Sequence, residues 1–258
     1  ANAIWGDGNG TTWVAENDGV VLRIGASGTE RLGTGTKAAL KGVWGSAPDN
    51  VWIVGSSGTA LHWTGRGLCP WQLPISQVEG ISGSAPDDVW VAGGSDGSLA
   101  HFDGQKWTAS KLPSTDFDTI HGVFVAGRND VWVVGKSPWH FDGATWKKMP
   151  VNGPASTSSY DTIWGTGPKD IYAAGTFVMA HWDGTVWSPI DWMTASGQGL
   201  GGTAPNDVWV AGSDVKHWDG GGWTAAPIGP KPSINALWVS PTEIWAAGDY
   251  GAVLRKTR

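Results

Sequence analysis

The feature that most constrains the fold is an internal repeat that returns about every forty residues along the chain. Aligning the copies on one aromatic position gives seven units, spaced by 36 to 42 residues. That position holds Trp13, Trp52, Trp90, Trp132, Tyr172, Trp209 and Trp245. A unit of this length is too small to bury a hydrophobic core alone, so the copies must pack against one another in a single array.

One copy, residues 83–107, shows how the unit is built. In Asp88–Gly93 and Ser98–Phe102, apolar residues alternate with polar ones or follow one another over the length of a strand. Gly, Ser and Asp residues separate the two segments, so the pattern predicts a β-hairpin. A further strand precedes the turn at 85–88, and another follows the tight Asp103-Gly104 turn. Seven units of four short antiparallel strands predict an all-β fold, a seven-bladed β-propeller with negligible helix.

We expect one propeller domain over residues 1–258, with repeats at approximately 3–40, 41–78, 79–119, 120–160, 161–197, 198–233 and 234–258. The chain begins at the first strand of the first unit and stops after the third strand of the seventh, so the last blade is expected to lack its outer strand. Either residues that precede Ala1 in a longer parent protein supply that strand, or the blade stays three-stranded with a basic edge that discourages pairing.

Composition argues against several classes of protein. The 40 glycines, 15 prolines and 16% charged residues indicate many tight turns, and no run approaches the roughly 18 apolar residues of a membrane span. Lysines and arginines are scattered in a chain of net charge −6, whereas nucleic-acid binding needs a concentrated basic face. The single cysteine, Cys69, cannot form an internal disulfide, so packing must hold the fold. We therefore expect no nucleic-acid partner and no membrane insertion.

The pattern Asp-Gly-x-x-Trp occurs at residues 103–107, 142–146, 183–187 and 219–223. These segments resemble a shortened Asp-box, and the whole repeat is similar to bacterial extracytoplasmic propellers of the Asp-box, or BNR-like, type. The resemblance implies that the motif joins the third and fourth strands of a blade, and that the protein is extracellular, at the cell surface or periplasmic. That superfamily includes sialidases, lectins, assembly factors and receptor ectodomains, so the resemblance concerns architecture and not activity. WD40 and kelch arrays have similar periods, but this repeat lacks the paired Gly-His and Trp-Asp ends of WD40 units and the double-glycine pattern of kelch units.

Most of the 20 tryptophans recur at fixed positions, so we expect them in the core between blades. Eight residues before the aligned aromatic stand Trp5, Trp44, Ser82, Phe124, Trp164 and Gly201, and Trp238 stands seven residues before Trp245. Aromatic residues that break the register are instead candidates for stacking on a sugar ring. They are Phe117, Trp139, Tyr160, Trp192 and Tyr250.

Five histidines occupy one register on the third strand of a unit, namely His62, His101, His140, His181 and His217. Arg23 and Arg255 take that place in the first and last units. The histidines are spread one per blade without a companion ligand nearby, which disfavours a metal site. Each lies near a repeated aspartate (Asn50 in the second unit), so we expect a structural hydrogen bond between them. His121 matches no other histidine and is a candidate functional residue.

Catalysis finds little support in the sequence. A sialidase needs three clustered arginines, and the arginines here are scattered. Motifs of phosphate-binding loops and zinc proteases are absent, and no strand-to-helix elbow of a serine hydrolase is predicted. Asp116 and Asp118 could form a glycosidase pair, but two aspartates in such a loop are more typical of a solvated or calcium-binding loop. We expect a protein that is not an enzyme and has no cofactor and no metal in its site.

Loop lengths single out one face of the disc. The turns from the first to the second strand, and from the third to the fourth, keep nearly constant lengths, whereas the other two kinds of connection differ between units. Connections that differ create an asymmetric surface able to bind a ligand. The candidate ligand-binding residues on that face are Phe117, Asp118, His121, Tyr160, Asp161, Trp192, Asp249 and Tyr250.

Two classes of function fit this set of residues. Flat aromatic rings stack on pyranoses and carboxylates accept hydroxyl hydrogen bonds, so we expect a non-catalytic, lectin-like propeller that binds a glycan. A protein-protein interaction or assembly scaffold would use the same loops, with a surface protein as the partner. A glycoside hydrolase of sialidase-like fold is the weaker alternative.

Overall fold

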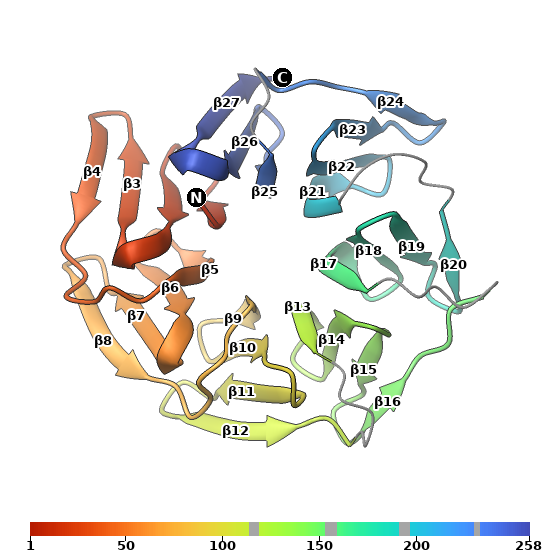
Figure 1. Ribbon diagram of the computed structural model, residues 1–258, viewed down its shortest axis with the longest axis horizontal. Coiled ribbons are helices and arrows are strands. Elements are labelled where there is room, and N and C mark those ends of the chain that lie inside the picture. Colours follow the sequence, from red (N-terminus) through yellow and green to blue (C-terminus); the bar gives the residue numbers. More distant parts are fainter. Residues whose placement is uncertain (114–118, 153–158, 191–196, 230–232) are drawn as a thin grey trace.

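The computed structural model is a closed ring of seven antiparallel β-sheets, which confirms the predicted seven-bladed propeller (Figure 1). It describes residues 1–113, 119–152, 159–190, 197–229 and 233–258. Six sheets have four strands in chain order, and the last has three, as expected. Within these ranges the helical segments are the 3₁₀ turns η1 (Asn17–Gly19), η2 (Ser56–Gly58) and η3 (Asp249–Gly251). No helix there is long and apolar enough to cross a membrane.

Each blade runs from an inner strand to an outer strand at the rim (Figure 1). Blades 1 and 2 consist of β1 (Ala3–Gly6), β2 (Thr12–Ala15), β3 (Val21–Gly25), β4 (Gly28–Leu32), and β5 (Leu40–Ala47), β6 (Asn50–Gly55), β7 (Thr59–Trp63), β8 (Leu68–Gln72). Blades 3 and 4 consist of β9 (Gly80–Ala85), β10 (Asp88–Gly93), β11 (Ser98–Phe102), β12 (Trp107–Lys111), and β13 (Ile120–Gly127), β14 (Asp130–Gly135), β15 (Trp139–Phe141), β16 (Trp146–Lys148). Blades 5 and 6 consist of β17 (Tyr160–Gly167), β18 (Asp170–Gly175), β19 (Val178–Trp182), β20 (Trp187–Pro189), and β21 (Gly197–Ala204), β22 (Asp207–Gly212), β23 (Val215–Trp218), β24 (Trp223–Ala225). Blade 7 consists of β25 (Ile234–Val239), β26 (Glu243–Gly248) and β27 (Val253–Thr257).

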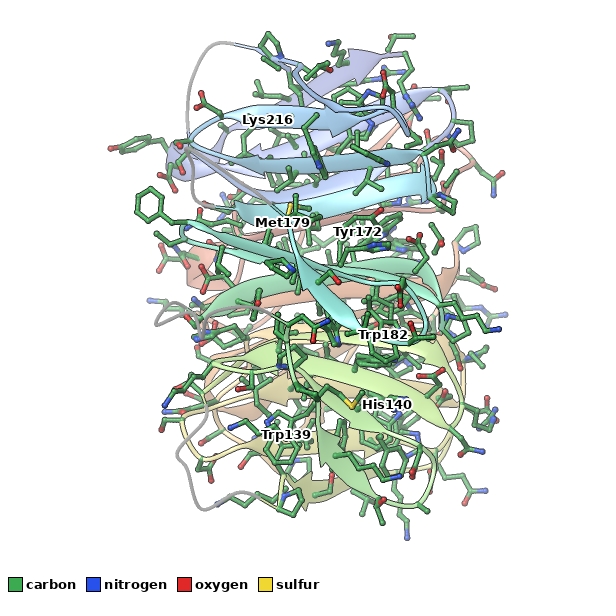
Figure 2. All side chains as sticks on the ribbon, turned by 90° about the vertical axis from the view of Figure 1, so that its right-hand side faces the viewer. Trp139, His140, Tyr172, Met179, Trp182 and Lys216 are labelled. Carbon is green, nitrogen blue, oxygen red and sulfur yellow. The ribbon has the colours of Figure 1, made fainter. Side chains whose placement is uncertain are left out.

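The hydrophobic core lies between neighbouring blades. One cluster joins Trp52 of blade 2 to Phe102 of blade 3, and another includes Tyr172 and Met179 of blade 5, which Figure 2 labels, with residues of blade 6. The recurring tryptophans therefore pack where the sequence predicted. Trp139 is also buried, with 6% of its surface exposed, so its prediction as a ligand-stacking aromatic is wrong.

The Asp-Gly-x-x-Trp segments form the turns from third to fourth strand, as the resemblance implied. In blade 3, Asp103 Oδ1 accepts hydrogen bonds from the backbone N–H groups of Gln105 and Lys106, both at 2.9 Å. Gly104 has a φ of 90°, a left-handed conformation that glycine adopts without strain. The aspartates of the other three segments accept the equivalent bonds, so the motif fixes a turn.

The repeated histidines make the predicted structural hydrogen bonds. In blade 3 the His101 Nε2–H donates to Asp88 Oδ1 at 2.8 Å, and the His101 ring stacks on Trp90 with centroids 4.4 Å apart. Trp90 and Ser84 also donate to the fully buried Asp88 carboxylate. Blades 4, 5 and 6 repeat the histidine-aspartate bond at 2.9, 2.7 and 2.8 Å, and in blade 2 an asparagine replaces the aspartate. These bonds join the second strand of a blade to the third.

The Asp88 network gives a testable dependence of stability on pH. Burial raises the pKa of Asp88. Hydrogen bonds from His101, Ser84 and Trp90, together with the charge of His101, lower it by more than burial raises it. The pKa of Asp88 is therefore below its usual range. The ionised carboxylate therefore stabilises the fold above the ordinary aspartate pKa of about 4, and this contribution is lost as the pH falls through the lower folded value. We expect the difference in free energy of unfolding between wild type and Asp88→Asn to shrink between about pH 5 and pH 2, measured by urea titration. A difference that stays constant with pH would contradict this assignment.

Five aromatic side chains from the inner strands form what we call the aromatic belt, namely Trp5, Trp44, Phe124, Trp164 and Trp238. With Ser82 and Gly201, which occupy the same register in blades 3 and 6, they line a cavity of about 370 Å³ on the axis of the ring. The cavity is lined by residues of all seven inner strands, so it is part of the central channel.

Each residue of the aromatic belt lies against a glycine of the next blade. A Cβ added to that glycine would come within 2.7 to 3.0 Å of the aromatic ring. The pairs are Trp5 with Gly45, Trp44 with Gly83, Phe124 with Gly165, Trp164 with Gly202, and Trp238 with Gly6. Two inner strands carry a small residue at the belt position, and there the next blade carries valine. The Ser82 hydroxyl accepts a hydrogen bond from the Val125 N–H at 3.1 Å. Gly201 faces Val239. Large and small residues are therefore matched across all seven blade junctions.

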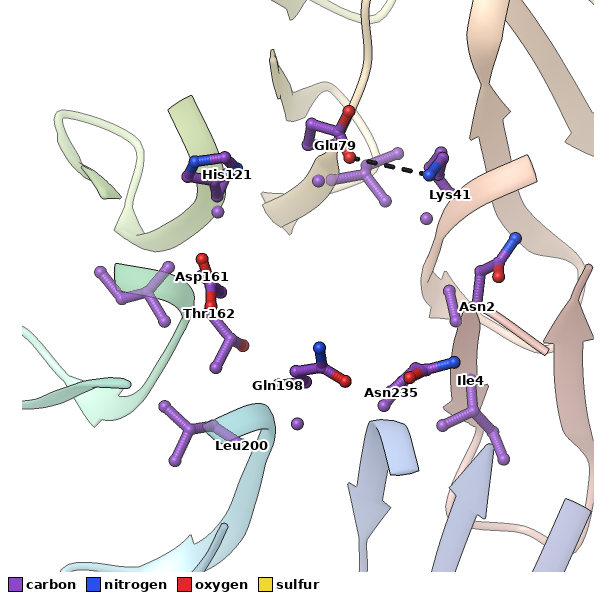
Figure 3. Close-up of a pocket in the computed structure, with 18 of the residues that line it drawn as sticks. Asn2, Ile4, Lys41, Glu79, His121, Asp161, Thr162, Gln198, Leu200 and Asn235 are labelled. Atoms are coloured by element: carbon purple, nitrogen blue, oxygen red, sulfur yellow. Dashed lines mark ion pairs between the residues drawn. The ribbon is translucent and has the colours of Figure 1, made fainter. Parts of the chain in front are cut away.

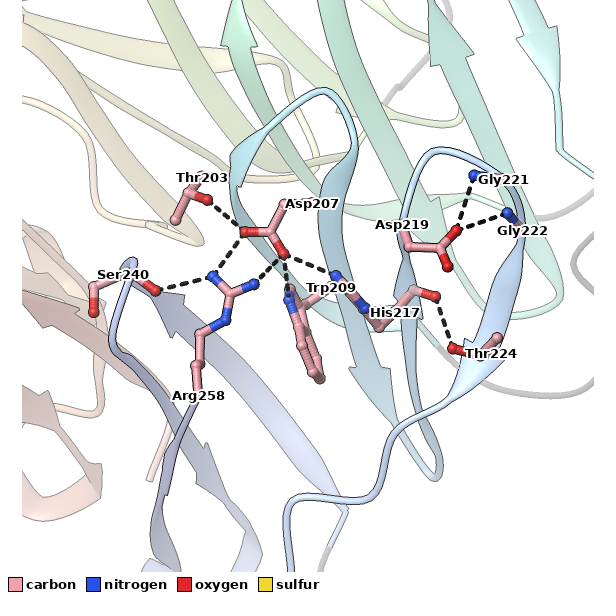
Figure 4. Close-up of polar contacts among 10 residues, drawn as sticks. All are labelled: Thr203, Asp207, Trp209, His217, Asp219, Gly221, Gly222, Thr224, Ser240 and Arg258. Atoms are coloured by element: carbon pink, nitrogen blue, oxygen red, sulfur yellow. Dashed lines mark hydrogen bonds and ion pairs between the residues drawn. The ribbon is translucent and has the colours of Figure 1, made fainter.

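Blade 7 is joined to both of its neighbours by polar contacts as well. Arg258, which follows β27, binds Asp207 of blade 6 through both guanidinium ends, at 2.5 and 2.8 Å (Figure 4). Asp207 also accepts hydrogen bonds from His217, Trp209 and Thr203, and it is 8% exposed. On the other side the Ala1 nitrogen donates to the Gly248 carbonyl at 2.6 Å.

Candidate functional site at the mouth of the central channel

One polar side chain from each blade lines the same end of the central channel. We call these residues the polar ring: Asn2, Lys41, Glu79, His121, Asp161, Gln198 and Asn235. Each stands three residues before the register of the aromatic belt. They surround a cavity of about 520 Å³, within the range typical of ligand sites (Figure 3).

A local irregularity of the inner strands explains why these side chains reach the channel. In β13, Ile120 pairs with Gly135 and Gly122 pairs with Val134, so His121 between them has no partner in the ladder. The same register shift occurs at Lys41, Asp161, Gln198 and Asn235. Such a β-bulge leaves one residue unpaired and redirects its side chain, and bulges are common beside functional sites. In blades 1 and 3 the ring residue directly precedes the inner strand.

The polar ring differs between blades although its surroundings do not. The next position along the strand is small or threonine in every blade: Ala3, Gly42, Gly80, Gly122, Thr162, Gly199 and Ala236. The position after that is aliphatic: Ile4, Val43, Ile81, Val123, Ile163, Leu200 and Leu237. Several of these aliphatic residues line both the polar-ring cavity and the aromatic-belt cavity, so the two are parts of one channel. A constant scaffold thus carries six different side-chain types at one position.

The charges of the polar ring are only partly paired. Lys41 Nζ lies 4.0 Å from Glu79 Oε2, and both side chains are about two-fifths exposed, so this ion pair is weak (Figure 3). Burial raises the pKa of Asp161. The charge of His121 and hydrogen bonds from Ser159 and the Thr176 backbone lower this pKa, but by less than burial raises it. The Ser159 hydroxyl is 3.5 Å from the Asp161 carboxylate, which is a long contact. Among the described residues, the hydrogen bonds to the Asp161 carboxylate at the edge of the cavity come from the Ser159 hydroxyl and the Thr176 backbone.

The structure brings together part of the predicted binding site. His121 and Asp161 stand in adjacent blades of the polar ring (Figure 3). Asp249, in η3, accepts a hydrogen bond from the side chain of Asn235 at 3.0 Å and so supports the ring from outside. Tyr250, also in η3, is fully exposed beside Asp249.

The predicted aromatic platform is not assembled in the described part of the chain. Tyr160 is 3% exposed and packs against Trp132 and Ile163, and burial raises the pKa of its hydroxyl. Its prediction as an accessible stacking residue is therefore wrong. Phe117, Asp118 and Trp192 lie outside the described residues.

Five residues of the polar ring escaped the sequence interpretation, namely Asn2, Lys41, Glu79, Gln198 and Asn235. The signal that could have found them is their constant distance of three residues before the belt register. It was hidden because the ring residues share no chemical type, whereas the other repeated positions do.

Solved structures of other propellers resemble this chain in fold. Virginiamycin B lyase from Staphylococcus aureus superposes with a TM-score of 0.88 at 15% identity, covering 100% of this chain and 94% of that one. YCF48 bound to D1 peptide gives 0.72 at 15% identity, with 97% and 89% covered, and the WD40 propeller domain of Doa1 gives 0.82 at 12% identity, with 98% and 91% covered. No protein-family model and no curated protein sequence matches the chain.

These similarities show a seven-bladed propeller. At such low identities they show the fold alone. The structures are a streptogramin-type lyase, a peptide-bound propeller and a WD40 propeller, so they do not bear out the Asp-box subtype that the repeat resembles.

Proposed function

We propose that the protein is a non-catalytic recognition propeller that holds a peptide, or an exposed segment of another protein, at the polar ring. One observation carries the proposal: six different polar side-chain types occupy a single register while the adjacent scaffold positions stay nearly constant. Strand pairing does not require this diversity at the five bulged positions, because a bulged residue has no partner in the ladder. Diversity at a fixed geometry is what recognition of an asymmetric partner requires.

The size of the site supports a protein segment as the partner. A cavity of about 520 Å³ admits one or two side chains but not a folded element. The described turn η3 lies beside the ring, where Asp249 contacts Asn235, and adds to the contact surface. A stable interface needs about 800 Å² from each partner. YCF48, a propeller of similar fold, has been solved with a peptide bound, which supports the same use of the fold here.

Carbohydrate binding, the function first expected from the sequence, has less support. A sugar site needs exposed aromatic rings near hydrogen-bonding groups. The polar ring contains no aromatic side chain apart from the His121 imidazole, and Tyr160 and Trp139 are buried. Among the described residues, Tyr250 is the one member of the predicted aromatic set that is exposed, and Phe177, which the sequence interpretation did not select, is 71% exposed.

Peptide selection tests the proposal. Peptides isolated from a random display library on the wild-type protein are expected to bind Lys41→Ala and His121→Ala about tenfold more weakly, because each variant removes one polar contact. The thermal stability of these variants should stay within about 0.5 kcal/mol of wild type, since the side chains are half-exposed.

The matched control is Glu30→Ala, on the outer strand β4, where the side chain is 60% exposed and far from the channel. It should bind the selected peptides as wild type does. The proposal is wrong if the selected peptides bind both ring variants as tightly as they bind wild type. It is also wrong if a glycan array yields binders when the peptide library yields none.

A further inference from the structure

Four residues of the polar ring come from four consecutive blades and lie along one side of the cavity. In order around the ring they are Asp161, Gln198, Asn235 and Asn2, which we call the oxygen arc. Figure 3 shows Asp161, Gln198 and Asn235 across the cavity from the Lys41–Glu79 ion pair, and Asn2 next to Lys41. The cationic Lys41 has the Glu79 carboxylate as its own partner, on the side away from Asp161.

The amide groups of Asn235 and Asn2 have a fixed orientation. Asn235 Nδ2 donates to the Ala1 carbonyl at 3.1 Å and to the Asp249 carboxylate at 3.0 Å. Carbonyl and carboxylate oxygens only accept, so the nitrogen must occupy this position and both its hydrogens are used. Asn2 Nδ2 likewise donates to the Leu40 carbonyl at 2.8 Å and to Asn17 at 2.9 Å. Both asparagines therefore have only their carbonyl oxygens left for a ligand.

The other members of the oxygen arc offer acceptors too. Neither asparagine oxygen accepts a hydrogen bond from any residue within the described ranges, and the exposed Gln198 amide makes none with them either. Asp161 adds a carboxylate whose one side-chain hydrogen bond, from Ser159, is long. The arc therefore combines one carboxylate with three amide oxygens. In two of the three amides, both N–H groups are already bonded to the protein.

We infer that the oxygen arc binds the guanidinium group of an arginine side chain in the partner segment, an inference that rests on the proposed function. A guanidinium presents five N–H donors in a rigid plane and no acceptor, which matches an arc of oxygens better than a neutral group does. The Asp161 carboxylate supplies the opposite charge, and hydrogen bonds between charged groups are the strong ones. The net charge of −6 also attracts a basic segment.

A set of three blocked peptides tests the inference. They have the sequence Gly-Gly-X-Gly-Gly, with arginine, lysine or citrulline as X. Citrulline keeps the shape of arginine but has no charge. Titration followed by NMR should shift the Gln198 side-chain amide and the Gly199 backbone amide with the arginine peptide. The citrulline peptide should bind at least about tenfold more weakly, and the lysine peptide should lie between them.

Two variants with the same change in charge separate the oxygen arc from general electrostatics. Asp161→Asn should weaken the arginine peptide about tenfold and leave the citrulline peptide unchanged. Glu30→Gln, on β4, should have no effect on either peptide. Equal binding of arginine and citrulline peptides, or full affinity in Asp161→Asn, would overturn the inference.

Failure of this inference differs from failure of the proposed function. Selected peptides that depend on Lys41 and His121, contain no basic residue and bind Asp161→Asn at full affinity would overturn the arginine assignment alone. Binding of the arginine probe to the arc, with no longer peptide recovered by selection, would overturn the peptide-recognition proposal and retain a guanidinium site.

Discussion

Replacing Gly6 by valine is expected to lower the free energy of unfolding by about 3 kcal/mol, at the upper end of the range for overpacking a filled site. A Cβ at Gly6 would lie 2.7 Å from the Trp238 ring, and no other side chain or backbone group shares the contact at that distance. This junction joins blade 7 to blade 1, where the last sheet has three strands. The free energy is measured by urea or guanidinium titration.

The pairing of Ser82 with Val125 suggests that a serine in place of Trp238 would make room for valine at position 6. Trp238→Ser alone should cost about 2–3 kcal/mol through the space it leaves. The double variant with Gly6→Val should cost less than the sum of the two single variants by about 2 kcal/mol, because valine fills that space. Gly127→Val is the control, since a Cβ there meets nothing within 4 Å, and it should be additive with Trp238→Ser. Additivity of the Gly6 pair as well would rule out the matching of large and small residues.

Truncating Asp207 to alanine is expected to cost about 3 kcal/mol, because it leaves several donors unpaired and each costs about 1–3 kcal/mol, more where the donor is charged. The variant strands the Arg258 guanidinium together with the donors of His217, Trp209 and Thr203 (Figure 4). These groups bring the Asp207 pKa far below its usual range although burial alone would raise it. The measurement is again the free energy of unfolding at neutral pH.

The matched control is Asp170→Ala in blade 5. Asp170 accepts hydrogen bonds from His181 and Thr166 but has no arginine partner in the described structure. The free energy of unfolding should therefore fall by about 1–3 kcal/mol. Arg258→Met should also cost less than Asp207→Ala, since Asp207 keeps its other hydrogen bonds. If Asp170→Ala and Asp207→Ala were equally destabilising, the contact between blades 6 and 7 would contribute nothing.

The framework could be predicted from the sequence because its interactions repeat. Trp52 and His62 stand opposite each other in the sheet, and the same holds for Trp90 and His101. The three-stranded last blade follows from the phase of the repeat. Each of these features depends on residues that are close in sequence and recur in several units.

The site could be predicted only in part, because its geometry depends on bulges that no residue pattern marks. The sequence identified His121 and Asp161 as exceptions to the repeat, but it gave no reason to connect them with Lys41 or Asn235. Tyr160 was also an exception, yet the strand that begins there pairs with Gly175 and turns the ring into the core. A departure from a repeat therefore identifies a residue that differs, but whether that residue faces the channel or the core is decided by strand pairing.

The two layers of the channel differ in how their residues can be exchanged during evolution. A belt residue can change only together with its partner in the next blade, as the change from Trp44 with Gly83 to Ser82 with Val125 illustrates. A bulged ring residue has no ladder partner, so a single substitution there leaves the strand pairing intact. Duplication of a repeat unit thus copies the framework, while point mutations at the ring positions change the polar groups at the mouth of the channel. At Lys41, His121 and Gln198, whose side chains make no hydrogen bond to the framework within the described ranges, such changes can accumulate one residue at a time.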